Sequence, residues 1–167
     1  MTKKIPMLLL ILVGAAGLAF FSAVPVSHSQ PEPEGYAGAN ACAMCHSELT
    51  AGWKTTRHAR AFDTLKKKSQ EKLPACVKCH VVGFEKPGGY VDQELTPELA
   101  GVQCESCHGP AAAHAANPAN KKGLIDPGEK TCRECHTPGQ DPKFDYAGKK
   151  RFVHGEAGKE GLNKRNE

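Results

Sequence analysis

The sequence predicts a mainly α-helical fold of short helices and long loops, with little or no β-structure, that is built around bound groups rather than around a side-chain core. Three observations carry this prediction. The 167 residues contain only one Trp, three Tyr and six Phe. They also contain 12 Pro and 17 Gly, which interrupt regular structure. Finally, eight Cys accompany eight His. A chain so poor in core-forming residues needs disulfides, metals or large apolar cofactors to fold.

The N-terminal residues predict export. Lys3 and Lys4 precede an apolar stretch over residues 5–21, and small and polar residues follow. This is the order of a Sec-type secretory signal, in which a basic region precedes an apolar region and a cleavage zone. Small residues make Ser27-His28-Ser29 the expected cleavage site.

The expected organisation is therefore a signal peptide over residues 1–29, one domain over 30–155 and a polar tail over 156–167. The alternative for the N-terminus is an uncleaved membrane anchor, since residues 5–26 are mostly apolar and long enough to cross a bilayer. With either N-terminus we expect a periplasmic or extracellular protein, in the second case anchored to the inner membrane.

The longest predicted helix covers residues 47–68. Its apolar and aromatic side chains recur on one face together with one histidine: Leu49, Trp53, His58, Phe62 and Leu65. Residues 81–100 predict a loop, with a short strand or hairpin around Gly88 and Gly89.

Three short helices are expected after this loop. A helical turn near Cys104 should end at Gly109-Pro110. The alanine-rich residues 110–116 should start another helix, and a third should begin near Pro127. Short helices separated by Gly and Pro agree with the predicted fold class.

The motif Cys-x-x-Cys-His occurs four times, at residues 42–46, 76–80, 104–108 and 132–136, and no cysteine lies outside these copies. It is the attachment motif of c-type haem, in which two thiols bond to the porphyrin and the histidine ligates the iron. Zinc knuckles and a disulfide framework also use paired cysteines, but neither requires a histidine after the second cysteine of every copy. At this chain's histidine frequency, four such coincidences arise about once in 200,000 sequences. The sequence therefore predicts four covalently bound haem c groups.

The predicted haem-binding residues follow directly from the motifs. The thioether cysteines are Cys42, Cys45, Cys76, Cys79, Cys104, Cys107, Cys132 and Cys135. The proximal iron ligands are His46, His80, His108 and His136.

The sixth ligands must come from elsewhere. Outside the motifs lie His28, His58, His114 and His154, and His28 falls within the predicted signal. Of the three methionines, two lie in the signal and Met44 lies inside an attachment loop. We therefore expect His/His or five-coordinate haems, which have lower potentials than His/Met haems.

Three distal histidines serve four irons, so one haem is expected to lack a protein sixth ligand and to be able to bind small molecules. Three alternatives are a retained His28, ligation by a lysine or the terminal amine, and a histidine donated by a neighbouring subunit of a homo-oligomer.

Several stretches resemble the cytochrome c-554 family of tetrahaem proteins. They are Tyr36-Ala-Gly before Cys42-Ala-Met-Cys-His46, Trp53 with Thr56-Arg-His58-Ala-Arg-Ala61, Val102-Gln-Cys104-Glu-Ser-Cys-His108-Gly-Pro110 with His114, Cys132-Arg-Glu-Cys-His136, and His154. The resemblance implies a compact, mainly helical fold around haems in stacked pairs. It also implies three His/His haems, with His58, His114 and His154 as distal ligands, and a five-coordinate haem on His80.

These features indicate an electron-transfer protein rather than an enzyme. Its expected partners are donor and acceptor cytochromes or a membrane quinol-oxidising complex, as in anaerobic respiration. Two alternatives are a haem enzyme that reduces a small nitrogen oxide and a subunit of a polymeric haem wire. No Cys-x-x-Cys-Lys motif occurs, and the candidate proton donors Asp92, Glu94 and Glu105 are expected to be surface or loop residues.

The net charge of +4 does not indicate nucleic-acid binding. Loss of the signal would leave 20 basic and 18 acidic side chains, and four haems would add eight propionates. The simplest interpretation of the remaining lysines, such as those at positions 66–68, 121 and 122, is a solvated surface.

Overall fold

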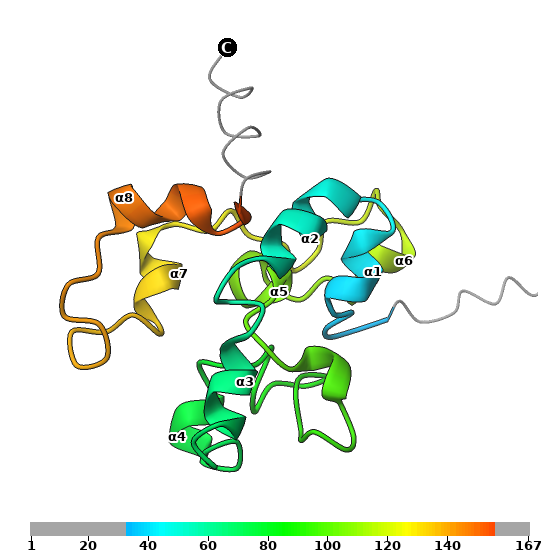
Figure 1. Ribbon diagram of the computed structural model, residues 1–167. Helices are drawn as coiled ribbons and strands as arrows, with labels where there is room; N and C mark the ends of the chain where they lie inside the picture. The colour runs from blue at the N-terminus through cyan, green and yellow to red at the C-terminus, as the bar shows by residue number, and fades with distance from the viewer. Residues whose placement is uncertain (1–32, 156–167) are drawn as a thin grey trace, which may run out of the picture. The chain divides into compact units, whose positions relative to one another are not determined.

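A computed structural model of the chain describes residues 33–155, which form short helices and long loops (Figure 1). The elements in chain order are α1 (Ala39–Ala43), α2 (Ser47–Lys54), α3 (Ala61–Lys66), α4 (Pro74–Val77), the 3₁₀ helix η1 (Pro97–Leu99), α5 (Cys104–His108), α6 (Ala112–Ala116), α7 (Glu129–Arg133), α8 (Tyr146–Lys149) and the 3₁₀ helix η2 (Lys150–Phe152). Within residues 33–155, β-pairing is limited to one isolated antiparallel bridge between Val81 and Ala100. The predicted fold class is confirmed.

The prediction of a single helix over residues 47–68 is wrong, because α2 and α3 are separated by a turn. Two threonines explain the break. The hydroxyl of Thr55 donates to the carbonyl of Gly52 at 2.8 Å, and the hydroxyl of Thr56 donates to the carbonyl of Trp53 at 2.7 Å. Side-chain hydroxyls of this kind compete with the backbone bonds that would continue a helix.

The break positions His58 outside any helix. Its carbonyl accepts the N–H of Val102 at 3.0 Å. The carbonyl of Val102 in turn accepts the indole N–H of Trp53 at 2.9 Å. The turn between α2 and α3 is therefore held against the segment that leads into the third motif.

The three short helices expected after residue 100 are present as α5, α6 and α7. The first ends at Gly109, which has a φ of 83°, a left-handed conformation that favours glycine. The predicted signal or anchor, its cleavage site, His28 and the polar tail lie outside the described residues.

Residues 81–100 form the predicted loop, and the strand or hairpin around Gly88 and Gly89 is not formed. The loop is closed by two backbone bonds of 2.9 Å, from the N–H of Val82 to the carbonyl of Leu99 and from the N–H of Tyr90 to the carbonyl of Val82. Gly83 has a φ of 64°, and the ring of Tyr36 packs so closely against it that a Cβ atom would not fit.

Buried apolar side chains are concentrated around the second motif. One cluster joins α3, α4 and the loop after them, and its members are Phe62, Leu65, Val77, Val81, Val82, Tyr90 and Leu99. Elsewhere in the described residues, the buried apolar positions are Ala39 and Ala111. The segments that carry the first, third and fourth motifs therefore bury few apolar side chains of their own.

A buried carboxylate ties the third motif to the segment before the first. Glu105 is 3% exposed, and its two oxygens accept the N–H groups of Ala37 at 2.9 and 3.1 Å, Gly38 at 2.7 Å and Ala111 at 2.8 Å. The expectation that Glu105 is a surface or loop residue is therefore wrong. For Asp92 and Glu94 it is confirmed, since both are exposed.

Gln103 makes a second tie at the same place. Its side-chain oxygen accepts the N–H of Ala39 at 2.6 Å, and its amide donates to the carbonyls of Glu98 at 2.7 Å and Ala100 at 2.9 Å. Gln103 also forms a capping box with Ser106 at the start of α5. Together Gln103 and Glu105 hold α5 against α1.

Candidate haem-attachment sites

Each motif adopts one helical turn, which explains its spacing. The N–H of His46 bonds to the carbonyl of Cys42 at 2.8 Å, and the N–H of His136 bonds to that of Cys132 at 2.9 Å. The third motif coincides with α5, and the second starts in α4 and ends with a bond from His80 to the carbonyl of Val77 at 2.8 Å. Residues three and four apart in a helical turn share a face, so both thiols and the imidazole of a motif emerge on the same side.

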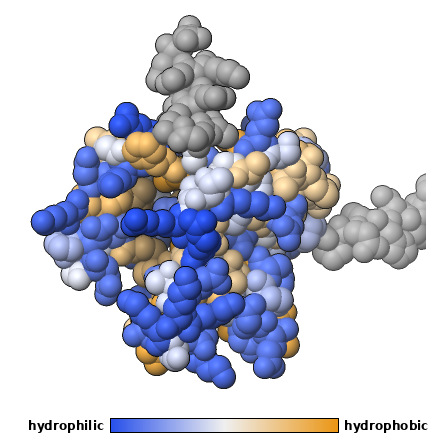
Figure 2. Space-filling model, in the orientation of Figure 1, coloured by the Kyte–Doolittle hydropathy of each residue, from blue (hydrophilic) through white to orange (hydrophobic). Residues whose placement is uncertain are grey.

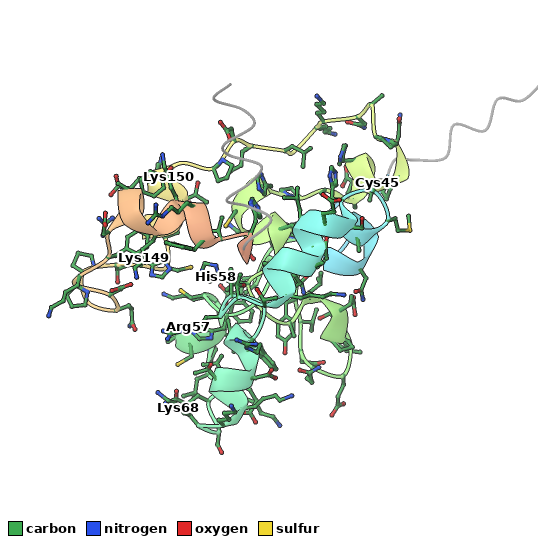
Figure 3. All side chains as sticks on the ribbon, turned by 45° about the horizontal axis from the view of Figure 1, so that its top comes forward. Cys45, Arg57, His58, Lys68, Lys149 and Lys150 are labelled. Atoms are coloured by element: carbon green, nitrogen blue, oxygen red, sulfur yellow. The ribbon has the colours of Figure 1, made fainter. Side chains whose placement is uncertain are left out.

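All eight motif cysteines carry free thiols, and seven of them are partly buried. The exception is the exposed Cys45, which Figure 3 shows beside α1. The fold brings thiols of different motifs together. The thiol of Cys42 interacts with that of Cys104, and the thiol of Cys79 interacts with that of Cys135. The first motif therefore lies beside the third, and the second lies beside the fourth.

Burial perturbs the thiols. It is the main cause that raises the pKa of Cys107 to about 11 and the pKa of Cys135 to about 12. The interaction between the thiols of Cys42 and Cys104 raises the pKa of the first and lowers the pKa of the second to about 7. The thiols thus face one another in partly enclosed surroundings.

Three predicted iron ligands have one ring nitrogen held by a backbone or side-chain oxygen. The Nδ1 atom of His80 lies 2.7 Å from the carbonyl of Ala61, and that of His114 lies 3.0 Å from the carbonyl of Asn120. The Nδ1 atom of His136 lies 2.9 Å from a carboxylate oxygen of Asp141. An N–H donated from Nδ1 leaves Nε2 as the lone-pair donor, which is the usual arrangement of metal-binding histidines.

Two predicted distal histidines face predicted proximal ones. The ring centroids of His58 and His136 are 6.0 Å apart, and those of His108 and His154 are 6.1 Å apart. Figure 3 shows His58 between α2 and α3, near the centre of the described part of the chain. Burial, followed by the nearby His136 and His80, lowers the pKa of His58. The ring of Phe144 stacks on His136 with the centroids 4.3 Å apart and so restricts its orientation.

Comparison with known proteins agrees with this geometry. The family model described as "Cytochrome c554 and c-prime" matches residues 41–109. The curated cytochrome c-554 of Nitrosomonas europaea is 41% identical over 90 residues, which cover 45% of this chain and 38% of that protein. The solved reduced state of cytochrome c554 from the same organism superposes with a TM-score of 0.55 and 28% identity, over 72% of this chain and 84% of that one.

In sequence and in structure the chain is similar to the cytochrome c-554 family. The sequence match spans well under half of the curated relative, whereas the structural match spans most of the solved one. Similarity to cytochromes c of this kind indicates covalently bound haem c.

The described residues fit haem c on three counts. The cysteines are unpaired in disulfides and share a face with the following histidine. A metal–nitrogen bond to imidazole is about 2 Å long, and the centre of the ring lies about 1 Å beyond that nitrogen. Two histidines that bind one iron from opposite sides would therefore have ring centroids about 6 Å apart. The pairs His58–His136 and His108–His154 have this separation. The scarcity of buried apolar residues around three of the motifs leaves apolar macrocycles to supply the core.

Sequence reasoning missed the roles of the residues that hold α5 in place and of the carboxylate that contacts His136. Glu105 and Asp141 carry no local signal, since each is one acidic residue among 18. Gln103 and Ser106 could have been found from their capping-box spacing. Within residues 33–155, no three His, Cys, Asp or Glu side chains are grouped to hold a metal ion, and none of the helices there is long and apolar enough to span a membrane.

Proposed function

We propose that this chain is a member of the cytochrome c-554 family and a tetrahaem electron-transfer protein, with one haem c on each Cys-x-x-Cys-His motif. The observation that carries the proposal is that each of the four motifs forms a helical turn, a spacing that places both thiols and the imidazole on one side. The eight motif cysteines would form the thioethers, and His46, His80, His108 and His136 would be the proximal ligands.

Bound haem c supplies an iron that cycles between the ferric and ferrous states. The chain's own contribution is to hold and orient the ligands. The ring separations support His58 as the partner of His136 and His154 as the partner of His108. His114 then remains for His46 or His80, and the family resemblance, which implies a five-coordinate haem on His80, supports His114 as the partner of His46.

That assignment leaves His80 as the proximal ligand of a haem with no protein ligand on its other side. The family resemblance supports the same position. His80 is oriented by the carbonyl of Ala61 and lies beside the cluster of buried apolar residues. Met44, inside the first attachment loop, is 77% exposed, so the structure does not support its sulfur atom as an iron ligand.

The remaining parts of the proposal concern location and partners. The basic and apolar N-terminal residues support export by the Sec pathway to the periplasm or cell exterior, with cleavage or anchoring at the N-terminus. The partners would be redox proteins that donate and accept electrons. An enzymatic role would need a proton donor at the open haem, and the carboxylate of Glu105 is already occupied by three backbone N–H groups.

Mass spectrometry of the purified holoprotein, followed by EPR of its oxidised form, tests the proposal. Four haems per chain, with three low-spin signals and one high-spin signal, are expected. Four low-spin signals would contradict the open site on His80 and point to an amine, His28 or a neighbouring subunit as ligand. A haem content below four would contradict the tetrahaem assignment.

A further inference from the structure

The charge of the described residues is unevenly distributed. Residues 54–78 carry eight basic and two acidic side chains, whereas the other residues between 33 and 155 carry nine basic and 12 acidic ones. The net charge of residues 54–78 is thus +6, and the net charge of the other residues between 33 and 155 is −3. Such an asymmetry gives the protein an electrostatic dipole that orients an approaching charged partner.

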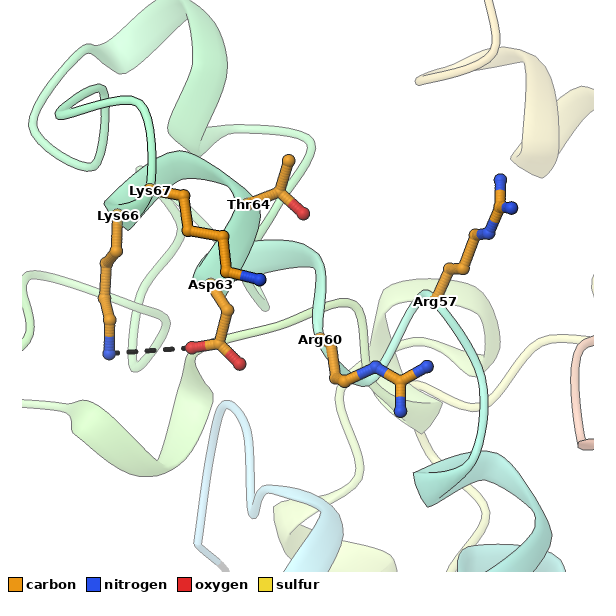
Figure 4. A pocket seen from close by; sticks show the side chains of 6 residues that line it. All are labelled: Arg57, Arg60, Asp63, Thr64, Lys66 and Lys67. Atoms are coloured by element: carbon orange, nitrogen blue, oxygen red, sulfur yellow. Dashed lines mark ion pairs between the residues drawn. The ribbon is translucent and has the colours of Figure 1, made fainter.

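The basic side chains of this segment are all exposed, and we call them the α3 basic surface: Lys54, Arg57, Arg60, Lys66, Lys67, Lys68, Lys72 and Lys78. Four of them line one shallow pocket with Asp63 and Thr64 (Figure 4). Asp63 is paired with Lys66 at 3.5 Å, so one acid neutralises only part of the charge there. Figure 2 shows a largely hydrophilic surface over the part of the molecule where Figure 1 places α3 and α4.

Part of this surface lies on the elements that position the second attachment site. Lys78 lies between Cys76 and Cys79 in the motif itself. The imidazole of His80 is held by Ala61, the first residue of α3, and buried apolar residues join α3 to α4. The elements that carry the positive charge are therefore the elements that position the His80 haem site.

We propose that the α3 basic surface is the docking site for a redox protein with an acidic face, and that electrons are exchanged there through the haem on His80. This inference rests on the proposed electron-transfer function and adds the class of partner and the point of contact. Complementary charge accelerates encounter and orients the two proteins, and the effect is screened by salt.

The test measures electron transfer by stopped-flow absorbance, with reduced flavodoxin as an acidic protein donor. The variant Lys67→Glu/Lys68→Glu reverses two charges of the surface and spares the ion pair of Lys66. The matched control Lys121→Glu/Lys122→Glu also reverses two adjacent exposed lysines, outside the α3 basic surface. Photoreduced lumiflavin, an uncharged reductant, reports on the haems without docking.

At low ionic strength we expect the Lys67/Lys68 variant to lower the second-order rate constant with flavodoxin about tenfold, and the control to change it less than about twofold. The difference should disappear as salt is added, and the rate with lumiflavin should be unchanged in both variants. If lumiflavin fails to reduce the wild type at all, the proposed function fails, independently of docking.

Three results would overturn the docking proposal. Equal slowing by both variants would show an effect of net charge alone. Slowing with lumiflavin as well would show that the lysines act on the haems, for example by pairing with propionates. A loss of binding to phosphatidylglycerol vesicles, with the flavodoxin rate unchanged, would assign the surface to an anionic membrane instead.

Discussion

Glu105 is the residue whose loss should most damage the fold. Its carboxylate accepts the N–H groups of Ala37, Gly38 and Ala111, at distances between 2.7 and 3.1 Å. In Glu105→Ala these donors lose their acceptor. A buried N–H without a partner costs about 1–3 kcal/mol, and the N–H groups of Gly38 and Ala111 are in buried surroundings. The expected loss is therefore about 2–6 kcal/mol, and Glu105→Gln, which keeps one acceptor oxygen, should lose less.

The assay is guanidinium unfolding of the holoprotein, followed by the fluorescence of Trp53, the only tryptophan in the chain. Bound haems should quench it in the folded state and release it on unfolding. Glu94→Ala is the control, because Glu94 is exposed and surface substitutions usually change stability by less than about 0.5 kcal/mol. If Glu105→Ala and Glu94→Ala unfold at the same denaturant concentration, the carboxylate does not hold α5 to the segment before α1.

Three further predictions concern the loop, a ligand and the cofactor. Gly83→Ala should destabilise the protein by more than about 1 kcal/mol in the same unfolding assay, because the φ of Gly83 is 64° and the ring of Tyr36 occupies the place of a Cβ atom. The control is Gly128→Ala, where nothing lies within 4 Å of an added Cβ atom. Equal midpoints would contradict this reasoning. Asp141→Asn should raise the midpoint potential of one haem in a potentiometric titration, because the anionic carboxylate increases the basicity of His136 and so favours ferric iron; an unchanged titration curve would show that Asp141 does not act through the ligand. Apoprotein made without haem attachment should lack a cooperative thermal transition by circular dichroism, because the only buried apolar side chains in the described residues outside the cluster near the second motif are two alanines. A cooperative apoprotein transition would show that the side chains suffice.

The sequence alone was enough for the fold class, and it predicts the attachment sites, because both depend on local features. Scarce core residues, frequent Gly and Pro, and four identical motifs predict short helices around bound groups. The spacing within Cys-x-x-Cys-His matches a single helical turn. In the first motif, for example, the N–H of His46 donates to the carbonyl of Cys42 at 2.8 Å. The failure over residues 47–68 had a local cause too, since the hydroxyls of Thr55 and Thr56 bond to carbonyls of the preceding turn and end α2.

Only the tertiary structure decided which histidines face each other. His58 and His136, and His108 and His154, are brought to about 6 Å by segments far apart in the chain. The same packing buries Glu105 against Ala37 and Gly38, although an isolated glutamate in the sequence predicts a surface residue. A motif within five residues is determined by its own backbone turn. A contact across 60 or 70 residues depends on every loop between its ends, and no local pattern encodes it.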